Sequence, residues 1–594
     1  MNKTIYQLFL ATVNQYPFRT ALRYKKQGRY LAITYQELKN SVDAVAAELR
    51  QLGIQQKDKV GIFSYNRPEW VIADLAIMKL GAIVVSIYHN LPAFYAKYIT
   101  NDSKMKLIFV ENSELFATIE SIRTETPSLK KVVLFDDSGV DPGKDFIKFS
   151  DMKKTELRTI LEPVLISKDE LATIVYTSGT TGEPKGVMLT HHNIVTNALS
   201  AIKRFRIVPE DIFLSFLPLC NMFEKTCGYY TILFAGGSIA YVENFNTIAE
   251  DVKKIRPTIL ITVPRIIEKV YDTVVKKTKE SSFIKRVLLQ SAINNLNEYA
   301  NRQYKNLKIP LWLKIKYFLY NQFIAAKFRK LAGGRVRVIV SGSAPLNREV
   351  AKILHILGFN IMEGYGLTET APIVCTNLLE DRRLGTVGKP IDDVEIKIGE
   401  NDEILVKGPN LMKGYLNKPE ETAKAIDQDG WFHTGDQGKF DEYGNLAITG
   451  RIKEIIVTSY GKKIGPVPIE QKISESEHVE QVMLYGDKMK HIVALIVPNR
   501  VSIERYARTK GISFDDYPAL LATDLIKELF KHKIEVATSE LASYEKPIAF
   551  ALIAESFTVE NGLLTPTLKL RRNQVIEKYK SLIESIYQTC EIAK

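Results

Sequence analysis

Short apolar runs alternate with longer segments of helical periodicity along much of this chain, and that alternation constrains the fold more than any other feature. The first runs are continuously apolar, and they occupy residues 59–64, 83–88, 105–112, 130–137 and 171–179. The segment 68–82, between the first two runs, has the spacing of a helix that ends at a glycine. Strands that are apolar on both faces and separated by helices are typical of parallel sheets covered on both sides. We therefore predict an α/β fold in which parallel-rich sheets pack against helices.

The length of the chain and a change in its pattern of predicted strands and helices indicate more than one domain. With 594 residues, the chain exceeds what a single hydrophobic core usually supports. The α/β pattern resumes at 336–346, but beyond about 385 short strands flanked by polar residues and turns take over. We predict a large N-terminal domain over 1–450, with a β-rich subdomain at about 385–450. Residues 451–594 are predicted to form a small α+β C-terminal domain.

The net charge of the chain limits the classes of binding partner that we expect. The formal net charge is +13, in a chain with 45% apolar and 25% charged residues. A basic excess on a globular protein can serve nucleic acid, an anionic membrane or a phosphorylated small substrate. The sequence has neither zinc-finger spacings nor an arginine-rich tail, which argues against nucleic acid. We expect polyphosphate ligands and a membrane surface, and no obligate protein partner.

Cysteine usage and hydropathy indicate the compartment. Four cysteines are too few and too scattered for a disulfide framework. The N-terminus has the pattern of an amphipathic helix rather than a signal peptide, and no run approaches the roughly 18 apolar residues that span a bilayer. We expect a cytoplasmic protein, with a peripheral position on the inner face of a membrane as the alternative.

The stretch 176–191, "YTSGTTGEPKGVMLTH", is rich in hydroxyl groups and glycine and carries a lysine beside its only proline. We expect a junction from a strand through a loop to a helix that begins near His191, where glycines let a phosphate approach backbone N–H groups. The spacing differs from the G-x-x-x-x-G-K-[ST] loop of common nucleotide-binding proteins. The predicted phosphate-binding residues are Thr177, Ser178, Gly179, Thr180, Thr181, Gly182 and Lys185.

Four further motifs follow in order along the chain. They are "EGYGLTET" (363–370), "WFHTGD" (431–436), "GRIKE" (450–454) and "LLTPTLKLRR" (563–572). Together with the phosphate stretch, their order and approximate spacing closely resemble those of the AMP-forming adenylating superfamily, which includes acyl-CoA synthetases, luciferase and peptide-synthetase adenylation domains. The tail motif and "LPLCNMFEK" (217–225) most resemble the long-chain fatty acid–CoA ligase branch.

The resemblance implies a two-step reaction. A carboxylate attacks the α-phosphate of ATP to give acyl-AMP and pyrophosphate, and the thiol of coenzyme A then displaces AMP. By resemblance Lys569 is the catalytic cation at the α-phosphate, Thr368 binds that phosphate, and Glu369 with Thr177 holds Mg²⁺. Lys185 would hold the leaving pyrophosphate. Such chemistry depends on positioning and electrostatic stabilisation.

The same resemblance places the nucleoside and the hinge. Asp436 would accept both ribose hydroxyls, with Arg451 near the ribose, and Lys453 would be the hinge about which a mobile C-terminal domain swings. The predicted adenine slot comprises Gly342, Ser343, Ala344, Glu363, Gly364 and Tyr365.

Two predictions concern the acyl group. By analogy, an acyl tunnel would be lined by residues after "LPLC", namely Asn221, Phe223, Thr226, Tyr229 and Tyr230. Asn221 stands where close relatives usually carry histidine, and Val457 stands where they often carry lysine, so contacts transferred to those positions are in doubt. The segment 309–334 interleaves aromatic and basic residues, which fits either a membrane-interface helix or a core-packing hairpin with a solvated basic face.

Three functions are consistent with parts of this sequence. The resemblance favours an ATP-dependent long-chain fatty acid–CoA ligase that uses Mg²⁺, ATP and coenzyme A. An acyl-adenylate ligase that passes the acyl group to a carrier-protein thiol is the alternative within enzymes. A lipid-binding pseudoenzyme or membrane scaffold would be expected to lack the catalytic set, whereas Lys185, Glu369, Asp436 and Lys569 are all present.

Overall fold

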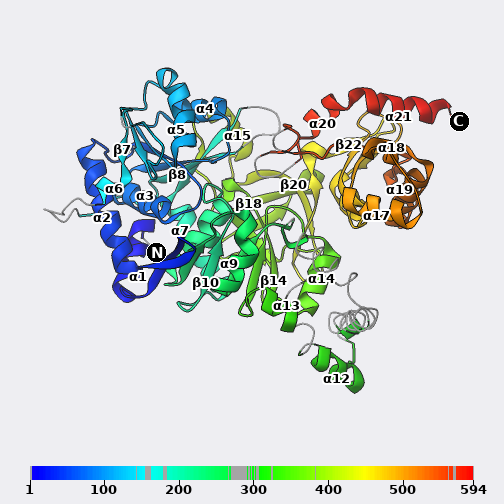
Figure 1. Ribbon diagram of the computed structural model, residues 1–594, viewed down its shortest axis with the longest axis horizontal. Helices are drawn as coiled ribbons and strands as arrows, with labels where there is room; N and C mark the ends of the chain where they lie inside the picture. Colours follow the sequence, from blue (N-terminus) through cyan, green and yellow to red (C-terminus); the bar gives the residue numbers. More distant parts are fainter. Residues whose placement is uncertain are drawn as a thin grey trace. The chain divides into compact units, whose positions relative to one another are not determined.

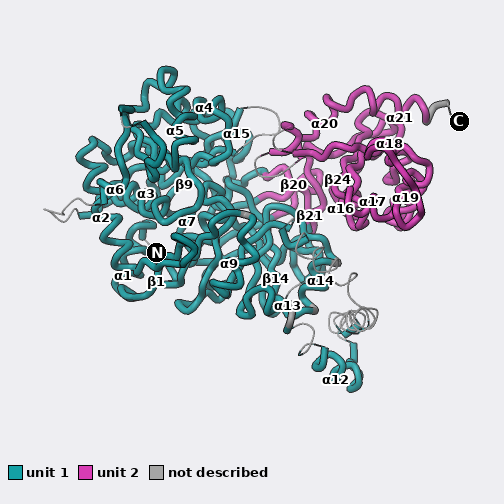
Figure 2. The backbone as a smooth tube through the Cα atoms, in the orientation of Figure 1, with its two compact units in different colours: residues 1–396, 406–433, 440–447 teal, residues 397–405, 434–439, 448–594 magenta. Residues whose placement is uncertain are grey.

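The structure is a computed structural model, and the residues it describes form two compact units. They are 3–141, 143–153, 162–177, 183–264, 266–268, 307–320, 326–381, 383–558, 561–565 and 570–592, with single residues at 291, 295, 298, 299, 302 and 322. Unit 1 comprises residues 1–396, 406–433 and 440–447, and unit 2 comprises residues 397–405, 434–439 and 448–594 (Figure 2). The domain boundary predicted at 450 stays a prediction.

One eight-stranded sheet in unit 1 contains the apolar runs that begin the chain. Its order is β19-β9-β8-β4-β3-β5-β6-β7. The bounds are β3 (Lys59–Phe63), β4 (Ile83–Ile87), β5 (Leu107–Val110), β6 (Lys131–Leu134), β7 (Ile147–Lys148), β8 (Leu171–Thr177), β9 (Lys185–Thr190) and β19 (Gly414–Tyr415). The strands from β8 to β7 in this order pair in parallel, as the continuous apolar runs predict. The predicted α/β class is confirmed.

Helices pack against this sheet because their faces are apolar. In α3 (Pro68–Lys79) every residue except Glu69 is buried, which is typical of a helix enclosed by protein on all sides. It packs against α2 (Tyr35–Gln51), which begins with a capping box at Thr34 and Glu37. Others in unit 1 are α1 (Ile5–Gln15), α4 (Ala93–Ser103), α5 (Ser113–Ile122), α6 (Phe149–Met152), α7 (His191–Phe205), α8 (Thr231–Phe234), α9 (Ile248–Ile255), α12 (Leu311–Tyr320), α13 (Ala326–Leu331), α14 (Arg348–Ile356) and α15 (Pro419–Ala425) (Figure 1).

A second, nine-stranded sheet in unit 1 has the order β16-β15-β14-β13-β12-β10-β11-β1-β2. The bounds are β1 (Thr20–Lys26), β2 (Arg29–Thr34), β10 (Ile212–Ser215), β11 (Ser238–Tyr241), β12 (Ile259–Thr262), β13 (Val338–Ser341), β14 (Ile361–Gly366), β15 (Ile373–Thr376) and β16 (Lys389–Pro390). The central strands are parallel, so their carboxyl ends meet at one edge of the sheet, where ligands bind in open α/β folds.

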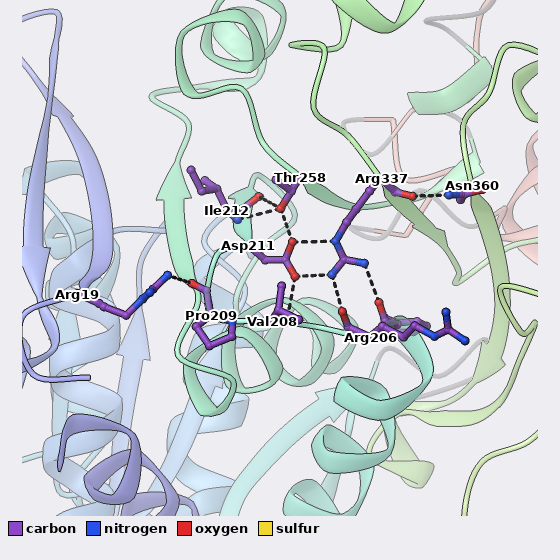
Figure 3. A network of polar contacts seen from close by, with 10 residues as sticks. Arg19, Arg206, Val208, Pro209, Asp211, Ile212, Thr258, Arg337 and Asn360 are labelled. Atoms are coloured by element: carbon purple, nitrogen blue, oxygen red, sulfur yellow. Dashed lines mark hydrogen bonds and ion pairs between the residues drawn. The ribbon is translucent and has the colours of Figure 1, made fainter. Parts of the chain in front are cut away.

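The opposite edge of this sheet is held by a polar network centred on Asp211, which directly precedes β10 (Figure 3). Thr258 Oγ1 donates to its carboxylate at 2.7 Å, and Arg337 Nε donates at 2.9 Å. The Arg337 carbonyl in turn accepts from Asn360 Nδ2 at 2.8 Å. Each of these residues stands immediately before a strand, so the network aligns the amino ends of β10, β12, β13 and β14.

The later part of the chain is β-rich and then α+β, as predicted. A four-stranded sheet has the order β17-β18-β20-β21, with β17 (Glu395–Ile398), β18 (Glu403–Lys407), β20 (Phe432–Phe440) and β21 (Leu446–Arg451). Residues of this sheet belong to both units, whereas unit 2 alone contains β22 (Ile456–Val457), β23 (Lys463–Ile464), β24 (Val479–Tyr485), β25 (Val493–Pro498) and β26 (Ala549–Leu552). Its helices are α16 (Pro466–Ser474), α17 (Arg500–Thr509), α18 (Tyr517–Ala522), α19 (Asp524–Ala537), α20 (Arg572–Lys578) and α21 (Lys580–Ile592).

One local prediction is wrong. The phosphate stretch does not lead from a strand through a loop straight into a helix, because strand β9 intervenes and pairs antiparallel with β8. Helix α7 does begin at His191, where a capping box between Thr190 and Asn193 satisfies the first backbone N–H groups. The stretch is therefore a β-hairpin followed by a helix. Across the described residues, no helix combines the length and the apolar character needed to cross a membrane.

Candidate active site

The hairpin of β8 and β9 fixes the two ends of the predicted phosphate stretch. Thr177, the last residue of β8, pairs directly with Lys185, the first residue of β9. Residues 178–182, which contain the predicted ligands Ser178, Gly179, Thr180, Thr181 and Gly182, lie outside the described residues. The paired strands hold the backbone of Lys185, so its position varies only by rotation of the side chain.

The Lys185 ammonium group has two partners that the sequence analysis missed. Its Nζ lies 2.6 Å from Glu421 Oε2 and 4.9 Å from the centroid of the Tyr415 ring. Tyr415 belongs to β19, which pairs antiparallel with β9. Hydrogen bonds from Lys185 and Lys424 lower the pKa of Glu421 to about 2, so this carboxylate is ionised at neutral pH.

The Tyr415 hydroxyl links this lysine to the predicted metal ligand, since it donates to Glu369 Oε1 at 3.0 Å. Burial, followed by the nearby Glu369 charge, raises the pKa of Tyr415, so the phenol remains a donor. Glu369 and Thr368 lie in the short 3-10 turn Thr368–Thr370. The turn is fixed by buried Asn197 and Asn410, whose amides donate to the Thr370 carbonyl at 3.2 and 3.1 Å.

These residues fit a magnesium ion. Among the described residues Tyr415 alone donates to the Glu369 carboxylate, which leaves Oε2 for a cation. Nowhere in the described part of the chain do three His, Cys, Asp or Glu side chains gather as a metal site. Mg²⁺ typically binds through one or two carboxylates, waters and substrate phosphates rather than in an all-protein cage. Glu369, with the Thr177 hydroxyl, would hold the ion.

The predicted adenine slot lies where β13 and β14 end. Gly342, Ser343 and Ala344 follow β13, and Glu363, Gly364 and Tyr365 belong to β14 beside it. A Cβ at Gly342 would come within 2.9 Å of the Phe223 ring, so this glycine allows the predicted tunnel residue to approach. At Gly366 a Cβ would lie 1.8 Å from the Pro372 carbonyl oxygen, which excludes any side chain there.

Glu363 has an unusual environment within this slot. The side chain retains partial solvent exposure, yet protein atoms crowd its carboxyl group from most directions. That desolvation raises the pKa of Glu363 to about 8, against a weaker opposing effect of a hydrogen bond to the Leu346 backbone. The carboxyl group is therefore mostly protonated at neutral pH, and it can donate a hydrogen bond as well as accept one.

Unit 2 contains the residues predicted for the ribose and the hinge. Arg451 Nε lies 2.8 Å from Asp436 Oδ1, and Asp436 is almost fully buried. Lys453 is exposed in the 3-10 turn Ile452–Glu454. The next residue, Glu454, lies 3.4 Å from Arg572 Nε, and Arg572 also binds Glu470. Lys569 lies outside the described residues, so its catalytic role stays a prediction.

The residues predicted for the acyl tunnel lie at and before a π-helix, Glu224–Tyr230. Thr226 and Tyr229 are fully buried, and the Tyr229 ring meets Trp70 edge-on, with centroids 6.1 Å apart. Asn221 lies just before this helix, and its Oδ1 accepts a hydrogen bond from Phe223 N at 2.9 Å. π-Helical turns are rare and are often found at functional sites.

A buried ion pair at this π-helix was not predicted from sequence. Lys225 Nζ lies 3.1 Å from Asp74 Oδ1, and both side chains are completely buried. Tyr229 and Tyr230 donate to Asp74 Oδ2 at 3.1 and 2.8 Å. Burial lowers the pKa of Lys225, and the Asp74 charge opposes that effect. The pair joins α3 to the π-helix.

Comparison with known proteins identifies the class. The AMP-binding enzyme family matches residues 9–416, and the C-terminal domain of AMP-binding enzymes matches residues 453–591. The first match alone covers more than half of the 594 residues. This chain belongs to the AMP-binding enzyme family, so the predicted resemblance is confirmed.

Relatives that match over the full length indicate which branch of the family this chain is most similar to. Long-chain-fatty-acid–CoA ligase 5 of Rattus norvegicus is 31% identical over 99% of this chain and 89% of its own length. Long chain acyl-CoA synthetase 4 of Arabidopsis thaliana is 30% identical over 98% of this chain and 92% of its own. Among solved structures, the adenylation domain of a carboxylate reductase from Mycobacterium chelonae superposes with a TM-score of 0.75, at 23% identity and over 99% of this chain and 91% of that chain. That likeness supports the adenylating fold.

Proposed function

We propose that this protein is an ATP-dependent long-chain fatty acid–CoA ligase. The full-length similarity to long-chain ligases carries the proposal. The fatty acid carboxylate attacks the α-phosphorus of ATP, the bond to the bridging oxygen of pyrophosphate breaks, and acyl-AMP forms. The coenzyme A thiolate then attacks the acyl carbonyl and releases AMP. Transfer to a carrier-protein thiol is the less favoured alternative.

The residues take the following roles in this proposal. Lys185 neutralises the phosphates that leave, and Lys569 neutralises the α-phosphate as it is attacked. Glu369 and Thr177 would hold Mg²⁺, which when bound would supply positive charge against the charge that develops on the phosphates. Asp436 accepts the ribose hydroxyls. The Arg451 guanidinium, 2.8 Å from Asp436, keeps that carboxylate oriented.

The test is release of pyrophosphate across saturated acids from C2 to C20, with and without coenzyme A. We expect kcat/KM to rise by at least about 100-fold from C4 to C16, because each buried methylene contributes about 0.8 kcal/mol. Sustained turnover should require coenzyme A. A preference for short acids would overturn the long-chain assignment, and turnover with a carrier-protein thiol but not coenzyme A would establish the alternative.

We further propose that the protein contacts a membrane surface through α12, which lies within the segment 309–334 (Figure 1). Leu313 is fully buried and Tyr317 stacks on Tyr299 with centroids 4.0 Å apart, so one face of the helix packs inward. At the spacing of another face lie exposed apolar residues, with exposed fractions of 46 to 72%: Leu311, Trp312, Ile315, Phe318 and Leu319.

Two exposed lysines, Lys314 and Lys316, flank this apolar face on either side of the helix. An apolar face bordered by lysines suits the interface of a bilayer that contains anionic lipid. Flotation with vesicles of phosphatidylcholine and phosphatidylglycerol tests this. The double change Trp312→Ser with Phe318→Ser should reduce the bound fraction about tenfold or more, whereas Phe94→Ser, at a residue 64% exposed elsewhere, should not. Equal flotation of both variants would favour the core-packing alternative.

A further inference from the structure

We propose that Glu421 is a built-in competitor of phosphate for Lys185. In this proposal the Glu421 carboxylate pairs with the Lys185 ammonium group before nucleotide binds. The same ion pair forms again when pyrophosphate leaves. The inference rests on the proposed role of Lys185 as the partner of the leaving phosphates. It concerns a residue that the motifs do not include and that lies 236 positions away from the lysine.

The contact is close but open to exchange. Nζ of Lys185 and Oε2 of Glu421 are 2.6 Å apart, and the two side chains are 30% and 39% exposed. Ion pairs with this exposure contribute little to stability, because water and salt screen them. A polyanion that arrives from solvent with several charges can therefore displace a single carboxylate from the lysine.

The surroundings allow the exchange without leaving either charge unpartnered. Lys424 Nζ lies 3.2 Å from the other oxygen of Glu421, so the carboxylate keeps a cation after Lys185 leaves it. The Tyr415 ring, 4.9 Å from Lys185 Nζ, is a second partner for the ammonium group. Thr422 Oγ1 accepts from Tyr415 N at 2.9 Å and so fixes α15, which carries Glu421, against β19.

The geometry also connects the exchange to the metal ligand. Tyr415 contacts Lys185 with its ring and donates to Glu369 with its hydroxyl, so one side chain borders both the predicted phosphate-binding lysine and the predicted metal ligand. When Glu421 pairs with Lys185 again, pyrophosphate loses its contact with the lysine, while Glu369 keeps its hydrogen bond from Tyr415. Glu421 is thus a positioning residue that weakens binding of pyrophosphate and favours its release.

Isothermal titration with inorganic pyrophosphate and Mg²⁺ tests the inference without turnover. Glu421→Gln should lower the Kd for pyrophosphate about three- to fivefold, because the competing carboxylate is gone. Glu421→Asp keeps the charge but shortens the side chain, and it should also tighten binding. Glu420→Gln makes the same charge change on the neighbouring exposed residue, so it reports the general effect of removing a negative charge and should change the Kd less than twofold.

The outcomes separate this inference from the proposed function. If Lys185→Ala leaves the Kd for pyrophosphate unchanged, Lys185 does not bind phosphate and its proposed role fails. If Lys185→Ala weakens binding but Glu421→Gln and Glu420→Gln behave alike, the competition alone is wrong. Weaker binding in Glu421→Gln would also overturn it, because Glu421 would then support the lysine. In the double variant Lys185→Ala with Glu421→Gln, the tightening should disappear.

Discussion

Replacing Asp74 with asparagine will lower the free energy of unfolding by about 3 to 5 kcal/mol, the range measured when one partner of a buried ion pair is removed. Asparagine keeps the shape of the side chain but leaves the Lys225 ammonium group uncompensated among fully buried neighbours. Ser86 and Thr173 offer that group only long contacts, at 3.5 and 3.3 Å. The destabilisation therefore comes from an unpaired buried charge rather than from lost volume.

Urea unfolding followed by tryptophan fluorescence measures this effect, because Trp70 lies 5.1 Å from Lys225 Nζ. The double variant Asp74→Asn with Lys225→Met should be more stable than Asp74→Asn alone, since no buried cation remains. Asp392→Asn removes a surface partner of Lys203, whose side chain is 75% exposed, and should cost less than about 1 kcal/mol. A loss that matches this surface control would contradict the argument.

Strands could be predicted from the sequence where a continuous apolar run marks each of them. The runs that became β3, β4, β5, β6 and β8 are apolar on both faces, so their parallel pairing follows from burial alone. Strand β9 escaped prediction because glycine, proline and hydroxyl residues precede it, and its apolar residues lead directly into α7. β9 forms a strand because it pairs with β8. The periodicity of apolar residues along the chain carries no information about such pairing.

The motifs likewise located candidate residues but not their partners. Glu369 and Lys185 were named from motifs, whereas Tyr415, which borders both, lies outside every motif used. Asp74 and Lys225 were also missed, because a charge within an apolar helix or at the end of a motif gives no local sign of its partner 151 positions away. Such contacts arise when β19 joins the sheet and α3 meets the π-helix, so they depend on tertiary structure.

Replacing Glu369 with glutamine will lower the rate of acyl-AMP formation by at least about 100-fold while largely sparing thioester formation from supplied acyl-AMP. The amide retains the shape and can still accept from the Tyr415 hydroxyl, but it removes the charge that the magnesium ion requires. Pyrophosphate leaves only in the first half-reaction, whereas the second releases AMP, so the second should be much less affected.

Two variants separate the charge of Glu369 from its orientation. Tyr415→Phe removes the donor to Oε1, and we expect it to raise the Mg²⁺ concentration for half-maximal rate about tenfold, with a smaller loss of kcat. Glu380→Gln, a change on the surface where Glu380 is 61% exposed in its ion pair with Arg206, should alter neither half-reaction. The measurements are pyrophosphate release and thioester formation from acyl-AMP, each over a magnesium titration. Equal losses in both half-reactions of Glu369→Gln would place this carboxylate in general support of the fold, because pyrophosphate takes no part in the attack of a thiolate on acyl-AMP.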